Sequence, residues 1–203
     1  MFLVVGPRRD RDAEFVRALT IAFMLSLSLA AANARADEIS VEARRRDEAL
    51  EVVCRALLEA PLDLIWQTLT DYAHLAEFIP GMSMSRVVSQ KGAVTVVEQV
   101  GAARFLFISI PIEVTLSSTE RPPHAIDAKL IRGNLKRLEG TYRIEPQAGG
   151  RMQLSWSGVI EAESMPPLVG ELLLRSSIED QFRGMVREIQ RRDALSRARE
   201  PAK

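Results

Sequence analysis

The feature that most constrains this chain is its C-terminal segment. After Pro166 and Pro167, apolar residues recur at helical spacing over more than 20 residues, and charged residues fill the positions between them. This pattern predicts one long amphipathic helix. Its apolar positions are Leu168, Leu172, Ile178, Phe182, Met185, Val186 and Ile189. A helix of this kind needs an apolar surface to cover, and the preceding chain must supply that surface.

The preceding chain has the pattern of strands joined by short turns. Two strand-like runs are followed by two short helices, at 39–45, 50–58, 62–69 and 72–78. Further strand-like runs alternate with turn signals, as in an antiparallel meander, at 85–89, 94–100, 105–116, 125–131, 138–145 and 152–162. We therefore predict an α+β fold in which a curved antiparallel sheet wraps around the long C-terminal helix.

The N-terminal residues have the layout of a secretory signal peptide. Arginines such as Arg8, Arg9 and Arg17 precede an uncharged stretch at 18–34, and small residues follow at the expected cleavage site. Its strongly apolar part is shorter than the about 20 residues of a membrane span. We expect residues 1–36 to be cleaved near Ala36, which would export the protein to the periplasm or the extracellular space. Residues 37–192 would then form the folded domain and 193–203 a polar tail; an uncleaved anchor is the alternative.

Composition excludes several classes of function. The 27 Lys+Arg residues balance the 27 Asp+Glu residues, which disfavours a general nucleic-acid binder. One cysteine and two histidines leave little material for a metal centre. We expect Cys54 to be a buried, inert thiol, and Asp71 with His74 to be a solvated pair on a surface helix. The sequence predicts no metal, no cofactor and no catalytic group.

Several segments resemble the START-like superfamily, which includes polyketide cyclase/dehydrase and coenzyme-Q-binding domains. The segment Ala60 to Tyr72, APLDLIWQTLTDY, is similar to the opening of these domains. The segment that continues this opening in the family is similar to Ala76–Gly81 and Ser85–Val88 of this chain. A later pair of strands in the family is similar to Gly133–Tyr142. The resemblance covers about residues 50–192. It implies a helix-grip fold with an internal apolar cavity, and it leaves the ligand open because members include lipid carriers, quinone-binding proteins, ribosome-associated proteins and cyclases.

Alternation along the strands assigns residues to the inner face. Trp156 and Tyr142 point inward beside Gly158 and Gly140, and these small residues are expected to leave space for a pocket. Phe78, Ile79 and Met82 beside Pro80 are expected at its mouth. The predicted ligand-binding residues are Trp66, Phe78, Met82, Met84, Tyr142, Leu154, Trp156, Leu172, Ile178 and Phe182.

These expectations favour an exported protein that binds or carries a hydrophobic ligand, such as a lipid, an isoprenoid quinone or a polyketide-like molecule, without catalysis. Transient contact with a membrane fits this function. One alternative is a cyclase acting on an apolar substrate in the same cavity, for which Arg132 and Asn134 are the nominated polar groups. Another is a protein-interaction module that uses the run 105–116, which is apolar on both faces of a single strand.

Overall fold

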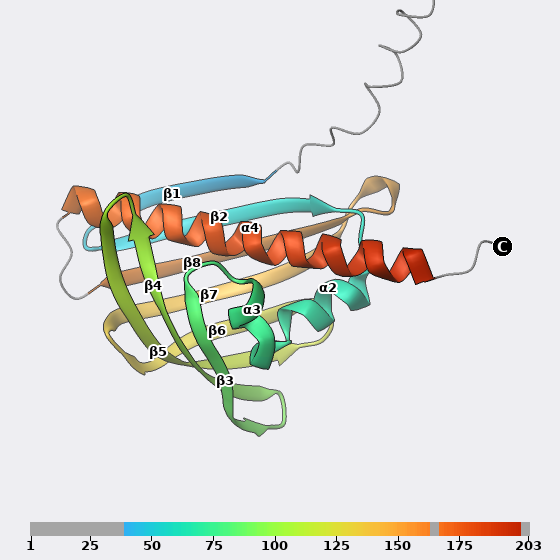
Figure 1. Ribbon diagram of the computed structural model, residues 1–203, viewed down its shortest axis with the longest axis horizontal. Coiled ribbons are helices and arrows are strands. Elements are labelled where there is room, and N and C mark those ends of the chain that lie inside the picture. Colours follow the sequence, from blue (N-terminus) through green and yellow to red (C-terminus); the bar gives the residue numbers. More distant parts are fainter. Residues whose placement is uncertain (1–38, 163–166, 200–203) are drawn as a thin grey trace, which may run out of the picture. The chain divides into compact units, whose positions relative to one another are not determined.

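The computed structural model describes residues 39–162 and 167–199. The predicted signal peptide, residues 1–36, lies outside the described residues. The described chain forms one eight-stranded antiparallel sheet in the order β1-β2-β8-β7-β6-β5-β4-β3, which confirms the predicted α+β fold (Figure 1). The strands are β1 (Ser40–Arg46), β2 (Ala49–Leu58), β3 (Met82–Lys91), β4 (Val94–Phe105), β5 (Ile108–Arg121), β6 (Ala125–Gly133), β7 (Leu135–Pro146) and β8 (Met152–Ala162).

Short helical elements separate the first two strands from the meander. They are α2 (Leu62–Leu69), η1 (Tyr72–His74) and α3 (Leu75–Phe78), and a further short turn, η2 (Ala148–Gly150), joins β7 to β8. Helix α2 begins directly after Pro61, whose carbonyl oxygen accepts from the amides of Leu64 and Ile65. Proline suits this place because the first amides of a helix lack partners within the helix.

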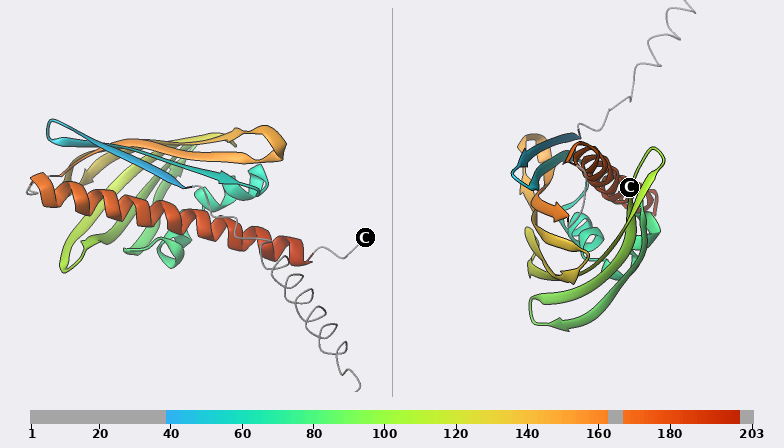
Figure 2. Two further views of the ribbon diagram at one scale, coloured as in Figure 1. Left: turned by 90° about the horizontal axis from the view of Figure 1, so that it is seen from above. Right: turned by 90° about the vertical axis from the view of Figure 1, so that its left-hand side faces the viewer.

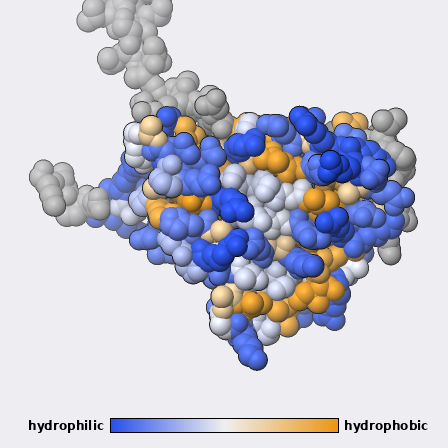
Figure 3. All heavy atoms as spheres, turned by 180° about the vertical axis from the view of Figure 1, so that it is seen from behind, coloured by the Kyte–Doolittle hydropathy of each residue, from blue (hydrophilic) through white to orange (hydrophobic). Residues whose placement is uncertain are grey.

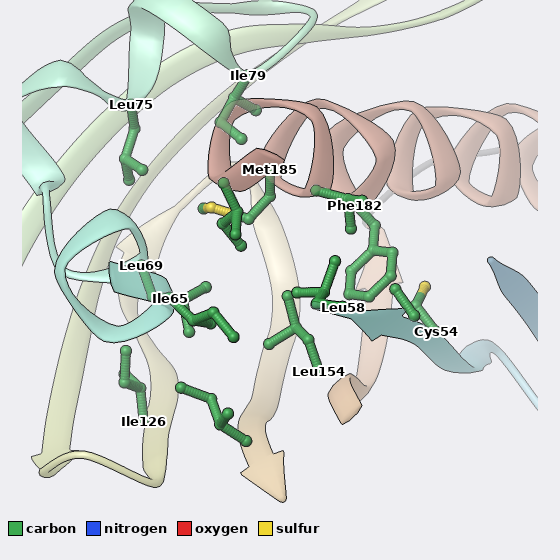
Figure 4. Close-up of a cluster of buried hydrophobic side chains, with 14 of the residues drawn as sticks. Cys54, Leu58, Ile65, Leu69, Leu75, Ile79, Ile126, Leu154, Phe182 and Met185 are labelled. Atoms are coloured by element: carbon green, nitrogen blue, oxygen red, sulfur yellow. The ribbon is translucent and has the colours of Figure 1, made fainter. Parts of the chain in front are cut away.

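The long helix α4 (Pro167–Arg199) lies along the inner face of the curved sheet, with α2 beside it (Figures 1 and 2). The core lies between them, where side chains from α2, α4 and the strands meet (Figure 4). Phe182, Met185, Val186 and Ile189 are buried apolar side chains of α4. The view from behind shows a surface that is largely hydrophilic, with hydrophobic areas among the polar residues (Figure 3). An apolar inner face and a largely hydrophilic outer surface agree with the alternation of apolar and polar residues along the strands.

The prediction of one strand over 105–116 is wrong. The chain reverses at Leu106 and Phe107, so that Phe105 of β4 pairs with Ile108 of β5 in a hairpin. The apolar run therefore contains a turn, and this is why both parities looked apolar. Leu106 has a positive φ of 54°, and the side chains of Leu106 and Phe107 are 83% and 92% exposed.

The expectation that Leu172 belongs to the buried stripe of α4 is also wrong. Its side chain is 51% exposed, whereas that of the neighbouring Leu173 is fully buried. Ile178 comes six positions after Leu172, so the two side chains lie about 120° apart around the helix axis and do not share one face. The inner face of α4 instead presents Leu174, Ile178 and Met185.

The C-terminal end of α4 extends into the segment that was predicted as a polar tail. Residues 193–199 are helical, and 200–203 lie outside the described residues. An ion pair between Arg197 and Asp193 spans one helical turn, and Arg197 also donates to the carbonyl oxygen of Glu59. These contacts explain how a polar sequence continues the helix. Within residues 39–162 and 167–199, no helix is long and apolar enough to cross a membrane.

Candidate functional site

Two adjacent cavities lie between α4 and the inner face of the sheet. The larger has a volume of about 170 Å³ and the smaller about 100 Å³. The smaller lies between β4 and the N-terminal half of α4; the larger extends towards α2 and η1. Six residues border both cavities: Met82, Gln99, Leu138, Ile160, Ile178 and Gln181. For comparison, a cavity of about 150 Å³ holds one benzene molecule.

The indole ring of Trp156 lines the larger cavity. A Cβ atom added to Gly140 would lie 2.8 Å from the indole Nε1, and one added to Gly158 would lie 2.6 Å from its Cζ2. The two glycines face each other on β7 and β8, so the indole lies across both. The expectation that these glycines leave empty space is therefore wrong: the indole occupies that space. Tyr142 packs beside it, with ring centres 6.4 Å apart and planes tilted by 53°.

The cavity walls are mainly apolar, with a few uncharged polar side chains. At one end Tyr72 donates a 3.2 Å hydrogen bond to Glu120, and Thr95 donates to the same carboxylate oxygen at 3.0 Å. Burial, together with Glu120, raises the pKa of Tyr72, which therefore remains a hydrogen-bond donor. On α4 the amide of Gln181 donates to the hydroxyl of Ser177 at 3.3 Å.

Five of the ten predicted ligand-binding residues line the cavities. They are Met82, Tyr142, Trp156, Ile178 and Phe182. Leu154 is fully buried and belongs to the solid core rather than to a cavity wall. Trp66 and Phe78 are partly buried and pack against this core from α2 and α3. Met84 is partly buried on β3, and Leu172 is half exposed; neither borders a cavity.

Sequence reasoning missed several lining residues. Leu138 and Ile160 have the same strand parity as Tyr142 and Trp156, so alternation places them on the inner face, but they were not included among the predicted ligand-binding residues. Gln181 lies one helical turn from Ile178, and this spacing places it on the same face of α4. Gln99 on β4 has no such signal, because only the fold brings it opposite α4. The other missed lining residues include Leu116, Ser118, Ile126, Ala128 and Met185.

Asp71 and His74 do form a pair, but it lies outside the cavities. His74 Nδ1 is 2.6 Å from Asp71 Oδ1, and Arg192 of α4 donates to the other oxygen at 2.8 Å. Partial burial alone would raise the pKa of Asp71, but the hydrogen bonds from His74 and Arg192 lower it. Arg192 also pairs with Glu188, and its guanidinium carbon lies 5.5 Å from the centre of the Phe78 ring. These contacts fasten η1 and α3 to α4.

The other polar residues singled out in the sequence do not border a cavity. Arg132 and Asn134 are exposed; Arg132 donates to Thr115, and Asn134 bonds to the backbone of Glu113 and Pro111. Cys54 is fully buried, and burial raises its pKa to about 12, so the thiol is inert at neutral pH. In the part of the chain that the structure describes, no group of three His, Cys, Asp or Glu residues could hold a metal ion.

Solved structures of several proteins share this fold. The aromatase/cyclase Zhui from Streptomyces sp. R1128 is 16% identical, with a TM-score of 0.60 over 71% of this chain and 95% of that one. A STAR-related lipid transfer protein from Xanthomonas axonopodis is 11% identical, with a TM-score of 0.55 over 76% and 99%. A major latex-like protein from Panax ginseng is 12% identical, with a TM-score of 0.54 over 72% and 98%. At these identities the likeness concerns the fold alone.

The sequence itself matches a protein family. No curated protein matches the chain. However, residues 58–185 match the family described as polyketide cyclase / dehydrase and lipid transport, and this match spans the elements from the end of β2 to the middle of α4. These elements contribute the residues that line both cavities. The chain therefore belongs to the polyketide cyclase/dehydrase and lipid transport family.

Proposed function

We propose that this protein binds and carries a hydrophobic ligand in the cavities under α4, without catalysing a reaction. The observation that carries this proposal is the composition of the cavity walls. They are built from aliphatic, aromatic and uncharged polar side chains, and no Asp, Glu, Lys, Arg or His lines them among the described residues. A general base needs a titratable group within reach of the substrate that can lose its proton. The titratable side chains on the walls are those of Tyr72 and Tyr142, and burial raises the pKa of both, so that they keep their protons at neutral pH. The same walls provide apolar surface that excludes water from a ligand.

The expected affinity suits a carrier. Burial of about ten methylene groups contributes roughly 8 kcal/mol. Before the cost of ordering the ligand, this corresponds to a dissociation constant of about 1 μM. A ligand held at this strength stays bound during transfer and is released when an acceptor competes for it.

The alternative of a cyclase has less support. The residues nominated for it, Arg132 and Asn134, do not border a cavity, and neither do Asp71 and His74. The similarity to Zhui concerns the fold, so it does not carry that protein's activity to this chain.

The proposal includes export after cleavage near Ala36. The support is the sequence pattern of residues 1–36, with basic residues before an uncharged apolar stretch. N-terminal sequencing of the protein from its own host is expected to start at Asp37. Full-length protein in the cytoplasmic fraction would contradict export and leave the cavity proposal intact.

The proposal also includes transient contact with a membrane, from which a carrier would load its ligand. Its support is the tip of the β4–β5 hairpin, where Leu106 and Phe107 are exposed beside strands that wall the smaller cavity. Replacing both with serine is expected to reduce cosedimentation with phosphatidylcholine vesicles. Equal cosedimentation of the wild type and this variant would contradict a role for the tip.

Uptake of a neutral apolar dye tests the central proposal. N-phenyl-1-naphthylamine is expected to become fluorescent on binding the wild-type protein at micromolar concentrations. Ala128→Phe places a ring in the larger cavity and is expected to weaken dye uptake by about tenfold or more. The matched control is Ala93→Phe, because Ala93 is exposed in the β3–β4 turn. Circular dichroism verifies that both variants fold, and equal uptake by the two would contradict binding in the cavity.

A further inference from the structure

Two glutamine side chains occupy the wall that the two cavities share. Gln99 comes from β4 and Gln181 from α4, and each borders both cavities. Gln181 makes one hydrogen bond, to Ser177 on its own helix. The side chain of Gln99 makes no hydrogen bond to any residue that the structure describes. Primary amides can both donate and accept. The wall that both cavities share therefore has hydrogen-bonding capacity that the protein itself does not use up.

Two further donors in the larger cavity have no protein partner. The hydroxyl of Tyr142 and the indole nitrogen of Trp156 make no hydrogen bond within residues 39–162 and 167–199, although both side chains line the cavity. Buried tyrosine and tryptophan usually place these groups against an acceptor. Both groups are donors, and a ligand oxygen that reaches them would supply the acceptor that each lacks.

The charge of the surroundings disfavours an anionic ligand. No positively charged side chain lines either cavity among the described residues, so a bound carboxylate would be buried without a counter-charge. In addition, the carboxylate of Glu120 lies behind the wall at Tyr72 and would repel an anion. An uncharged oxygen meets neither penalty, and it can accept from the free donors.

We propose that the cavities select an uncharged apolar ligand that carries a carbonyl oxygen, such as a ketone or an ester, and that Gln99 and Gln181 bind this oxygen. A carboxylate of the same size and shape is rejected. This inference rests on the proposed carrier function and names the ligand class that the carrier accepts. Gln99 and Gln181 determine specificity, whereas the apolar walls supply most of the affinity.

Three probes of nearly equal shape test this selection by calorimetric titration. They are 2-acetylnaphthalene with a carbonyl, 2-naphthoate with a carboxylate, and 2-ethylnaphthalene with neither. At about pH 8, where a carboxyl group is ionised, the wild type is expected to bind the ketone at least about tenfold more tightly than the carboxylate. Binding of the carboxylate is expected to strengthen as the pH falls towards its own pKa, while binding of the ketone stays constant.

Variants locate the selectivity. Gln99→Leu combined with Gln181→Leu is expected to weaken ketone binding by about 3- to 10-fold, the equivalent of one hydrogen bond. Binding of 2-ethylnaphthalene is expected to stay the same or to strengthen. The matched control is Gln90→Leu, an exposed glutamine of β3. The ethyl probe also reports whether the double variant keeps a folded cavity.

The outcomes separate this inference from the carrier function. If 2-naphthoate binds as tightly as the ketone at about pH 8, or if the double variant keeps full ketone preference over 2-ethylnaphthalene, the selection is overturned and the carrier function stands. If the double variant loses all three probes, the glutamines hold the fold and not the carbonyl, which also overturns the selection. If the wild type binds none of the probes, the carrier function fails and the selection fails with it.

Discussion

Among single residues, Trp156 shows how strand glycines shape the cavity. All three of the nearest atoms that a Cβ on Gly140 would meet belong to the Trp156 indole, at 2.8–2.9 Å. Such distances are shorter than carbon contacts allow, so a side chain at position 140 would push the indole into the cavity. Alternation placed these residues on the inner face, but it could not show that the large ring lies flat over the small residues.

We therefore expect Gly140→Ala to lower the free energy of unfolding by about 1–3 kcal/mol, because it overpacks this site. In a Trp156→Ala background the same change is expected to be neutral or stabilising, since the obstructing ring is gone and glycine is a poor strand residue. Urea unfolding of the four proteins in this double-mutant cycle measures the coupling. Additive effects would show that the indole does not cover Gly140.

His74 gives a pH dependence to stability. Its hydrogen bond to Asp71, together with the negative charges of Asp71 and Glu77, raises the pKa of His74. The folded state therefore binds this proton more tightly than the unfolded state does. The resulting stabilisation is fully present below the unfolded pKa of about 6.5, and it is lost as the pH rises through the raised folded value.

The expected result is that His74→Gln destabilises the protein more at about pH 5.5 than at about pH 8.5, on either side of this transition. Chemical denaturation at both pH values measures the difference between wild type and variant. Dye uptake is expected to be unchanged, because His74 lies outside the cavities. A difference in stability that is equal at both pH values, or larger at the higher one, would contradict this role of the pair.

At the level of elements, α4 shows what helical periodicity can and cannot predict. The existence of the helix and the burial of Phe182 and Met185 follow from the apolar spacing, whereas its continuation through residues 193–199 does not. Several leucines stand next to one another in its N-terminal half, and apolar spacing alone does not separate the buried Leu173 from the exposed Leu172. The inner face of α4 also contains Gln181, whose role depends on a strand far away in the sequence.

Adjacent leucines make a matched test of this assignment. Leu173→Ala is expected to lower the free energy of unfolding by about 2–5 kcal/mol, because the side chain is fully buried. Leu172→Ala is expected to cost less than about 1 kcal/mol, since Leu172 is half exposed. Thermal or urea unfolding distinguishes them. A larger loss for Leu172 than for Leu173 would mean that α4 is rotated relative to the sheet.

The β4–β5 hairpin marks another limit of sequence reasoning. Its turn consists of Leu106 and Phe107, and it contains no Gly, Asn, Asp or Pro to signal a reversal. Leu106 has a positive φ, which is unusual for leucine. Because both turn residues are apolar, the apolar pattern of the strand continues through the turn without interruption. By contrast, the turns at Asp47 and Gly149 have ordinary turn residues and were predictable.

For the molecule as a whole, the order of elements was enough to predict a sheet that wraps around one long helix. That order, together with the resemblance of residues 60–88 to START-like domains, predicts the fold and the presence of a cavity. Only some of the residues that line the cavities could be predicted from the sequence. Residues such as Leu138 follow from strand parity, whereas Gln99 and Gln181 become neighbours of one cavity only when β4 and α4 are packed together.

The most direct test of the carrier function is native mass spectrometry of the protein purified from its own host. We predict that the wild type retains a non-covalently bound molecule of a few hundred daltons, which organic solvent extracts. We predict that Ala128→Phe, with a ring in the larger cavity, gives mainly the bare chain, and that Ala93→Phe behaves as the wild type. A wild-type spectrum that contains only the bare chain, from protein that also takes up no neutral apolar dye, would contradict the account.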